Sequence, residues 1–158
     1  MYVPAVRRLL VLFTIAALAF AVAAAATIVP QKGIAGVSIG MSQGKVRSVL
    51  GKPSKVKHGT DSFGPYTQFK YPRLSVLFQS GSTVTQISTT RASEKTKTGA
   101  GVGSTEAQLR AKVKGLTCKT EGGFRHCYLG SFRPHKQVTD FSIKKGKVIR
   151  VDVGIVND

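Results

Sequence analysis

The chain has 158 residues, and its 24 Lys and Arg against 7 Asp and Glu give a formal net charge of +17. A charge of this size attracts polyanions and acidic surfaces over long distances. The scarcity of carboxylates argues against a hydrolase built on a pair of acids. The lack of Trp and of any nucleic-acid module signature argues against specific recognition of nucleic acid.

Residues 1–26 have the pattern of a signal peptide: two arginines near the start, an apolar run, and small residues at the end. Ala24 and Ala26 fit cleavage after Ala26. Cleavage there would remove only two of the 24 basic residues and no acid, so the basic charge belongs to the mature domain. The 18 residues 9–26 also reach the lower limit of a membrane-spanning helix, which makes an uncleaved anchor the alternative. We predict a secreted protein or one of the extracytoplasmic envelope.

A short motif occurs twice, with its residues 63 positions apart, and predicts a duplicated unit. Ile39, Gly40, Ser42, Val46 and Leu50 correspond to Val102, Gly103, Thr105, Leu109 and Val113. The serine and the threonine are suited to capping short helices, which we expect to end at Gly51 with Pro53 and at Gly115. The predicted division is a first unit at 27–90, a polar linker at 91–98 and a second unit at 99–158.

Each predicted helix precedes segments that alternate between polar and apolar residues, as strands do. The sequence thus predicts an α+β fold of two tandem repeats, each a short helix packed on an antiparallel β-sheet. Whether the two sheets join is left open. In the last strand we expect Ile149, Val151 and Val153 to face the core. The eight predicted strands are 54–58, 66–71, 74–78, 84–89, 116–120, 124–129, 138–143 and 147–153.

Cys118 and Cys127 flank the Gly122–Gly123 turn of a predicted hairpin. An even pair of cysteines in an exported chain is typical of a disulfide. We therefore expect this bond to staple the hairpin of the second unit.

The motif Ile39-Gly40-Met41-Ser42 with Val46, Leu50, Gly51 and Pro53 resembles the start of the SmpA/OmlA (BamE-like) domain. The layout is also similar to that of the secreted β-lactamase inhibitory proteins, which have two helix-plus-sheet repeats. This resemblance implies a non-enzymatic protein that grips a partner with aromatic residues on a concave sheet face and with a hairpin loop. The residues that could serve in this way are the loop 59–62 and the aromatic residues Phe63, Tyr66, Phe69 and Tyr71.

Other motifs do not predict catalysis, a metal site or a cofactor. The glycine-rich segment 98–105 lacks the lysine of a phosphate-binding loop, so we interpret it as the entry to a helix. A hydrolase remains a minor alternative. It would need two of His58, His126, Asp61 and Asp140 to meet in a cleft. Asp140 and Asp152 could be neighbours on paired strands, where we expect them to pair with Lys144 or Arg150.

Basic residues cluster near both predicted helices, with Arg47 and Arg110 at corresponding positions and Lys112 and Lys114 beside the second. Such residues form a solvated face or contact a polyanion. We predict an exported, non-enzymatic binding module that contacts an acidic protein or an anionic envelope polymer and associates with membrane surfaces. The alternative is a structural or assembly component of the cell envelope, held by its uncleaved leader. The oligomeric state is not indicated.

Overall fold

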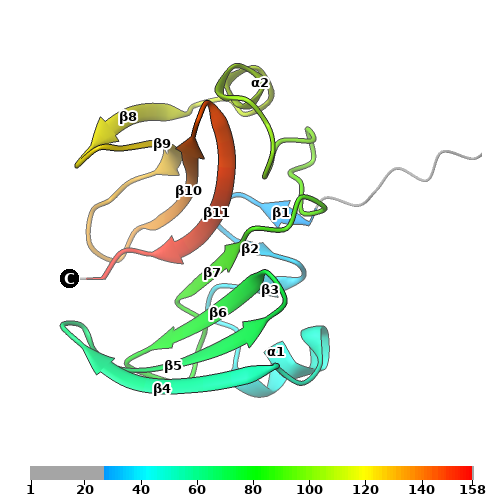
Figure 1. The fold of residues 1–158 in the computed structure, drawn as a ribbon. Helices are drawn as coiled ribbons and strands as arrows, with labels where there is room; N and C mark the ends of the chain where they lie inside the picture. The colour runs from blue at the N-terminus through cyan, green and yellow to red at the C-terminus, as the bar shows by residue number, and fades with distance from the viewer. Residues whose placement is uncertain (1–26, 158) are drawn as a thin grey trace, which may run out of the picture.

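The computed structural model describes residues 27–157, and its fold is predominantly β (Figure 1). One antiparallel sheet has eight strands in the order β4-β5-β6-β7-β11-β10-β9-β8, and a small sheet has the order β1-β2-β3. The strands are β1 (Ile28–Val29), β2 (Gly33–Ile34), β3 (Val37–Ser38), β4 (Lys55–Asp61), β5 (Gly64–Tyr71), β6 (Leu74–Gln79), β7 (Gln86–Thr89), β8 (Thr117–Glu121), β9 (Phe124–Gly130), β10 (Gln137–Lys144) and β11 (Lys147–Ile155).

The predicted fold of two tandem helix-on-sheet repeats is wrong. Strands β7 and β11 pair through residues 86–89 and 151–154, so the strands of both halves of the chain form one continuous sheet. Pairing of two edge strands satisfies N–H and C=O groups that would otherwise stay open to aggregation. The two helices of the described residues, α1 (Gln43–Leu50) and α2 (Glu106–Lys112), are too short to cover separate sheets, and each buries a single residue.

The predicted helix starts are confirmed. The Ser42 side chain accepts a hydrogen bond from the Lys45 backbone N–H at the start of α1. At the start of α2, Thr105 and Gln108 form a reciprocal capping box. Both caps satisfy backbone N–H groups that a first helical turn leaves free.

All eight predicted strands are present, with ends that differ by a few residues. The three strands of the small sheet were missed, because two residues are too few to show an alternating pattern. The prediction for β11 was partly wrong. The register shifts between Ser142 and Ile143, and Ile149 is the extra residue of a β-bulge. Val148 is therefore buried while Ile149 is 46% exposed.

The large sheet is curved, with both helices and the small sheet on one side and open space on the other (Figure 1). Strand β2 contacts the central strands β7 and β11. The core fills the space between these layers, and its largest fully buried side chains include Phe69, Phe78, Phe141, Ile34 and Leu109. The side of the large sheet that faces the core is called the core face below, and the other side is called the open face.

The predicted leader, residues 1–26, lies outside the described residues, so both its cleavage and its retention stay predictions. Within residues 27–157, neither helix has the length and apolar character needed to cross a membrane.

Candidate functional site

The strand register places a row of side chains across all eight strands of the open face. Starting at β4, the paired residues are Lys55, Lys70, Ser75, Ser88, Asp152, Asp140, Tyr128 and Thr117. Every member carries a polar group. The neighbouring row begins with Val56 at the edge of the sheet and points the other way, and its next members Phe69, Val76 and Ile87 are fully buried in the core. Because side chains alternate between the faces of a sheet, this row forms a polar band across the open face.

The β4–β7 half of the open face is basic. Lys55, Lys57 and Lys70 make no ion pair with any residue in the described part of the chain. A hollow of about 480 Å³ continues this surface toward β11. Its lining combines the cations of Lys70, Arg73 and Arg150 with the hydroxyl groups of Ser75, Ser88 and Thr90. Cations and hydroxyls together can bind the oxygen atoms of phosphate, sulfate or carboxylate groups.

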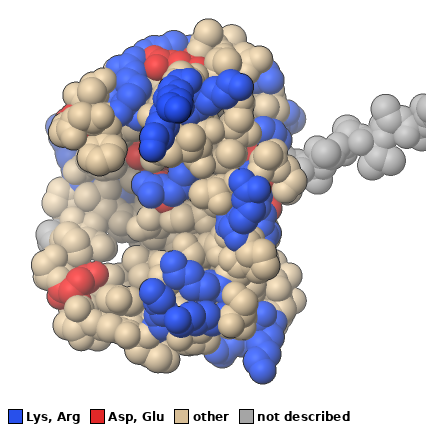
Figure 2. All heavy atoms as spheres, viewed as in Figure 1, with Lys and Arg blue, Asp and Glu red and all other residues tan. Residues whose placement is uncertain are grey.

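Basic side chains gather over both halves of the molecule. In the view of Figure 2, Lys and Arg form one group over the part of the molecule where β4 to β6 lie and another over the part around α2 and β8 to β11. Asp and Glu are few in this view.

A second hollow lies between the β8–β9 turn and the β10–β11 turn, and we call it the turn hollow. It measures about 660 Å³. Side chains from β8, β9, β10, β11 and both turns line it, including Phe124, His126, Asp140, Lys144, Lys145, Ile149 and Arg150. The register explains this gathering, since Ile143 on β10 pairs with both Arg125 and Val148.

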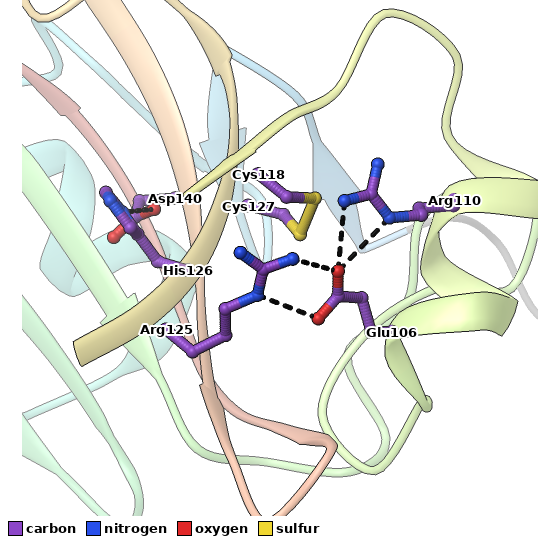
Figure 3. The surroundings of a disulfide bond; sticks show 7 residues. All are labelled: Glu106, Arg110, Cys118, Arg125, His126, Cys127 and Asp140. Carbon is purple, nitrogen blue, oxygen red and sulfur yellow. Dashed lines mark hydrogen bonds and ion pairs between the residues drawn. A yellow bond between two sulfur atoms is a disulfide. The ribbon is translucent and has the colours of Figure 1, made fainter. Parts of the chain in front are cut away.

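His126 and Asp140 form a hydrogen-bonded pair at this hollow (Figure 3). The His126 Nδ1 lies 2.8 Å from Asp140 Oδ1. The other ring nitrogen, Nε2, is buried without a hydrogen bond and lies 3.6 Å from Glu121 Oε2. Burial raises the pKa of the Asp140 carboxyl above its ordinary value, and the His126 hydrogen bond opposes this change.

A hydrolase would need two of His58, His126, Asp61 and Asp140 to meet, and His126 and Asp140 do so at this hollow. His58 and Asp61 lie on β4 and bond elsewhere, to Thr67 and Gln79. A general base needs its proton-accepting atom within reach of a substrate. Here the free nitrogen of His126 is covered. The arrangement supports a structural pair better than a catalytic one.

Asp152 lies opposite Asp140, as the sequence suggested, and its oxygens accept hydrogen bonds from Arg150 Nε at 2.7 Å and from Gln86 Nε2 at 3.3 Å. The predicted pairing with Arg150 is thus confirmed for Asp152. Asp140 instead pairs with His126.

The predicted disulfide is present between Cys118 and Cys127, which lie opposite each other on β8 and β9. Figure 3 shows the Glu106 carboxylate beside it, between the guanidinium groups of Arg110 and Arg125. The hydrogen bond from Arg125, and to a lesser extent that from Arg110, lowers the pKa of the Glu106 carboxyl below its ordinary value. Glu106 and both sulfur atoms lie within 4.8 Å of one another, but the disulfide leaves no thiolate that could bind a metal.

The predicted aromatic contact surface is only partly available. Phe69 is fully buried and Tyr71 is 8% exposed, because both lie on the core face of β5. They are therefore corrected from contact residues to core residues. Tyr66 lies on the open face of β5 and is half-buried, and Phe63 is exposed in the β4–β5 turn.

The predicted basic residues of the helices lie on the other side of the molecule from the open face. Arg47 stacks over the Phe69 ring at 4.4 Å, and Arg110 pairs with Glu106. Lys112 donates a hydrogen bond to the Gly99 carbonyl at 3.4 Å, while the Lys114 side chain is exposed. These four residues do not join the lysines of β4 and β5 in one site.

Sequence reasoning missed the roles of Arg73, Phe124, Ile149 and Arg150. Arg73 and Arg150 line one hollow, and Phe124, Ile149 and Arg150 line the other. Both groupings depend on strand register, and the second also on a bulge, which one sequence does not show. Of these residues, only Phe124 carried a local signal, since it directly follows the Gly122–Gly123 turn.

Searches with protein-family models and among curated proteins find no match. The resemblance to the SmpA/OmlA domain therefore stays an expectation. Two solved structures are similar. One is an extracellular protein containing a SCP domain from Bacillus anthracis, with a TM-score of 0.50 and 7% identity over 74% of this chain and 44% of that one. The other is a DUF4309 family protein from Bacillus subtilis, with a TM-score of 0.48 and 15% identity over 77% of this chain and 84% of that one.

At this identity the likeness to the first structure shows the fold alone. The matched part is less than half the length of the Bacillus anthracis protein.

Proposed function

We propose that this protein is an exported, non-enzymatic binding module that holds an anionic polymer of the cell envelope on the open face of its large sheet. The observation that carries the proposal is the set of lysines on β4 and β5 that make no ion pair with any described residue, next to a hollow lined by cations and hydroxyl groups. The leader-like segment, the disulfide and the extracellular nature of one structural neighbour support a location outside the cytoplasm.

The basic surface is extended, which favours a polymer over a compact ligand. Lys55 and Arg150 lie on β4 and β11, which are four strand spacings apart in the sheet. At about 4.8 Å for each spacing, the cations extend over about 19 Å. A linear polyanion with regularly spaced charges can contact several of these cations at once, and release of its counterions adds to the affinity. An acidic protein is the competing partner.

A salt-dependent binding assay tests the proposal. The probes are a poly(glycerol phosphate) polymer and an acidic globular protein, each titrated with the mature chain at low and high salt. The substitution Lys55→Gln/Lys57→Gln/Lys70→Gln removes three charges from the open face. We expect it to weaken polymer binding by tenfold or more.

The matched control is Lys45→Gln/Lys112→Gln/Lys114→Gln, which removes the same charge from the helix side. We expect this control to weaken binding only slightly. Equal losses in both variants would mean that net charge alone drives binding and would reject the open face as the site. Tighter binding of the acidic protein than of the polymer would reject the polymer as the partner.

The proposed export has its own test. Mass spectrometry of the N-terminus should find a chain that begins at Thr27. A chain that retains residues 1–26 in the membrane fraction would instead favour the envelope component held by an uncleaved leader.

A further inference from the structure

We propose that the turn hollow is a separate binding site for a small amphiphilic anion, whose apolar group lies between Phe124 and Ile149 and whose charged group meets Lys144 and Lys145. This site is distinct from the lysines of β4 and β5, and it does not depend on the function proposed for them.

The apolar walls are the first argument. Phe124 is 79% exposed and Ile149 is 46% exposed, and both line the turn hollow. Exposed apolar side chains that gather at one concave place indicate a binding site more strongly than scattered ones do. Two such residues, on the strands β9 and β11 that flank β10, are therefore better explained by a ligand than by chance exposure.

The β-bulge in β11 is the second argument, because it places Ile149 at this hollow. Without the register shift between Ser142 and Ile143, the alternation of β11 would bury Ile149 and expose Val148. Bulges commonly redirect a side chain next to a functional site. Here the bulge sets an apolar side chain among the charged residues of the open face.

The charges around the hollow are the third argument. Its acidic residues are already paired, Asp140 with His126 at 2.8 Å and Glu121 with Lys119 at 2.7 Å. Arg125 and Arg150 are paired as well, with Glu106 and Asp152. Lys144 and Lys145 have no ion pair with any residue between 27 and 157. The free charge at the hollow is therefore positive.

The size of the hollow decides between a single molecule and a membrane surface. Its volume of about 660 Å³ lies within the range of small-molecule sites. A flat bilayer would contact the protruding Phe124, but it would not reach the His126 and Asp140 side chains that line the hollow. A single acyl or aromatic chain with one phosphate, sulfate or carboxylate group fits both the walls and the charges.

Calorimetric titration of the mature chain tests this site. The probe is dodecyl phosphate below its micelle concentration. Inorganic phosphate and dodecyl maltoside serve as head-group-only and uncharged comparisons, and phosphatidylglycerol vesicles represent the membrane. We expect dodecyl phosphate to bind with one-to-one stoichiometry and at least tenfold more tightly than either comparison compound. The proposal would be overturned if dodecyl phosphate did not bind, or if the protein bound the vesicles but not dissolved dodecyl phosphate.

Variants locate the site. Phe124→Ser, and separately Lys144→Gln/Lys145→Gln, should each weaken dodecyl phosphate binding by tenfold or more. Val49→Ala, which shortens an exposed apolar side chain on α1, is the matched control and should leave binding unchanged. Because these residues are exposed, folding is retained, and circular dichroism checks it. Unchanged binding of dodecyl phosphate in both variants would reject the site. Polymer binding is measured with the same variants, because it tests the lysine surface of β4 and β5 independently of the turn hollow.

Discussion

Cys118 on β8 lies directly opposite Cys127 on β9, with the two Cα atoms 4.0 Å apart and the sulfur atoms bonded. The bond crosslinks a short hairpin and reaches the core through Cys127, which is fully buried. Loss of the crosslink gives the unfolded chain more conformational freedom. Reduction should therefore lower the free energy of unfolding by about 2 to 3 kcal/mol.

Urea unfolding with and without a reductant measures this difference. Reduction keeps both cysteines in place, so it separates the crosslink from the packing of the side chains. Cys118→Ala/Cys127→Ala should be insensitive to reductant. A reductant effect that persists in this variant would show that the difference does not come from the disulfide.

The positions of Phe69 and Phe63 predict a large and a small effect of truncation, respectively. Phe69 is fully buried, packs edge-on against Phe78 at 4.8 Å and lies under Arg47, so Phe69→Ala should cost about 3 to 5 kcal/mol of unfolding free energy. Phe63 is exposed in a turn, and Phe63→Ala should change stability by no more than about 0.5 kcal/mol. Thermal or urea unfolding distinguishes them, and similar losses in both variants would contradict the assignment of their faces.

Local signals in the sequence predicted the elements well. Ser42 and Thr105 mark the two helix starts because capping depends on residues three positions apart. The disulfide was predictable for a similar reason, since its two cysteines flank one turn. Strand positions followed from alternation between polar and apolar residues.

The arrangement of the elements could not be predicted, because it depends on pairing between distant residues. The pairing of β7 with β11 joins residues more than 60 positions apart and turns two expected sheets into one. Face assignment failed for β5, where Tyr66 and Tyr71 were grouped although an odd spacing places them on opposite faces. It failed again at Ile149, where the bulge reverses the alternation.

The buried position of Asp140 predicts a pH effect on stability. Burial raises the pKa of its carboxyl above the ordinary value of 3.8, so the folded state keeps this proton to higher pH than the unfolded state does. The stability contributed by the protonated group is thus complete below about pH 3.8 and is lost as the pH rises through the pKa of the folded state. Asp140→Asn removes this titration.

The measurement is the free energy of unfolding of the wild type and of Asp140→Asn from about pH 3 to about pH 5.5. The upper limit stays below the ordinary pKa of histidine. The wild type should lose stability relative to Asp140→Asn as the pH rises. Ser142→Ala, on the same face of β10, is the control and should show a difference from the wild type that does not vary with pH. A constant difference for Asp140→Asn would contradict the expected pKa.

Glu106 predicts the opposite dependence. Its carboxylate accepts hydrogen bonds from Arg125 and Arg110 and so ties α2 to β9 (Figure 3). These contacts lower its pKa below the ordinary value of 4.5, so the stabilisation is present above about pH 4.5 and is lost as the pH falls through the pKa of the folded state. Because the partners are partly exposed, Glu106→Gln should cost about 1 kcal/mol at neutral pH.

Urea unfolding at neutral pH and near pH 3 checks this prediction, and the difference between wild type and Glu106→Gln should nearly vanish at the lower pH. A carboxylate in the first turn of a helix also interacts with the helix dipole, so part of the effect is independent of Arg125. Arg125→Gln separates the two contributions, because it removes the contact with β9 and keeps the acid on α2. A double-mutant cycle of Glu106→Gln and Arg125→Gln should give a coupling energy that falls with added salt. Zero coupling would show that the contact with Arg125 contributes nothing, and that Arg110 and the helix dipole account for the role of Glu106.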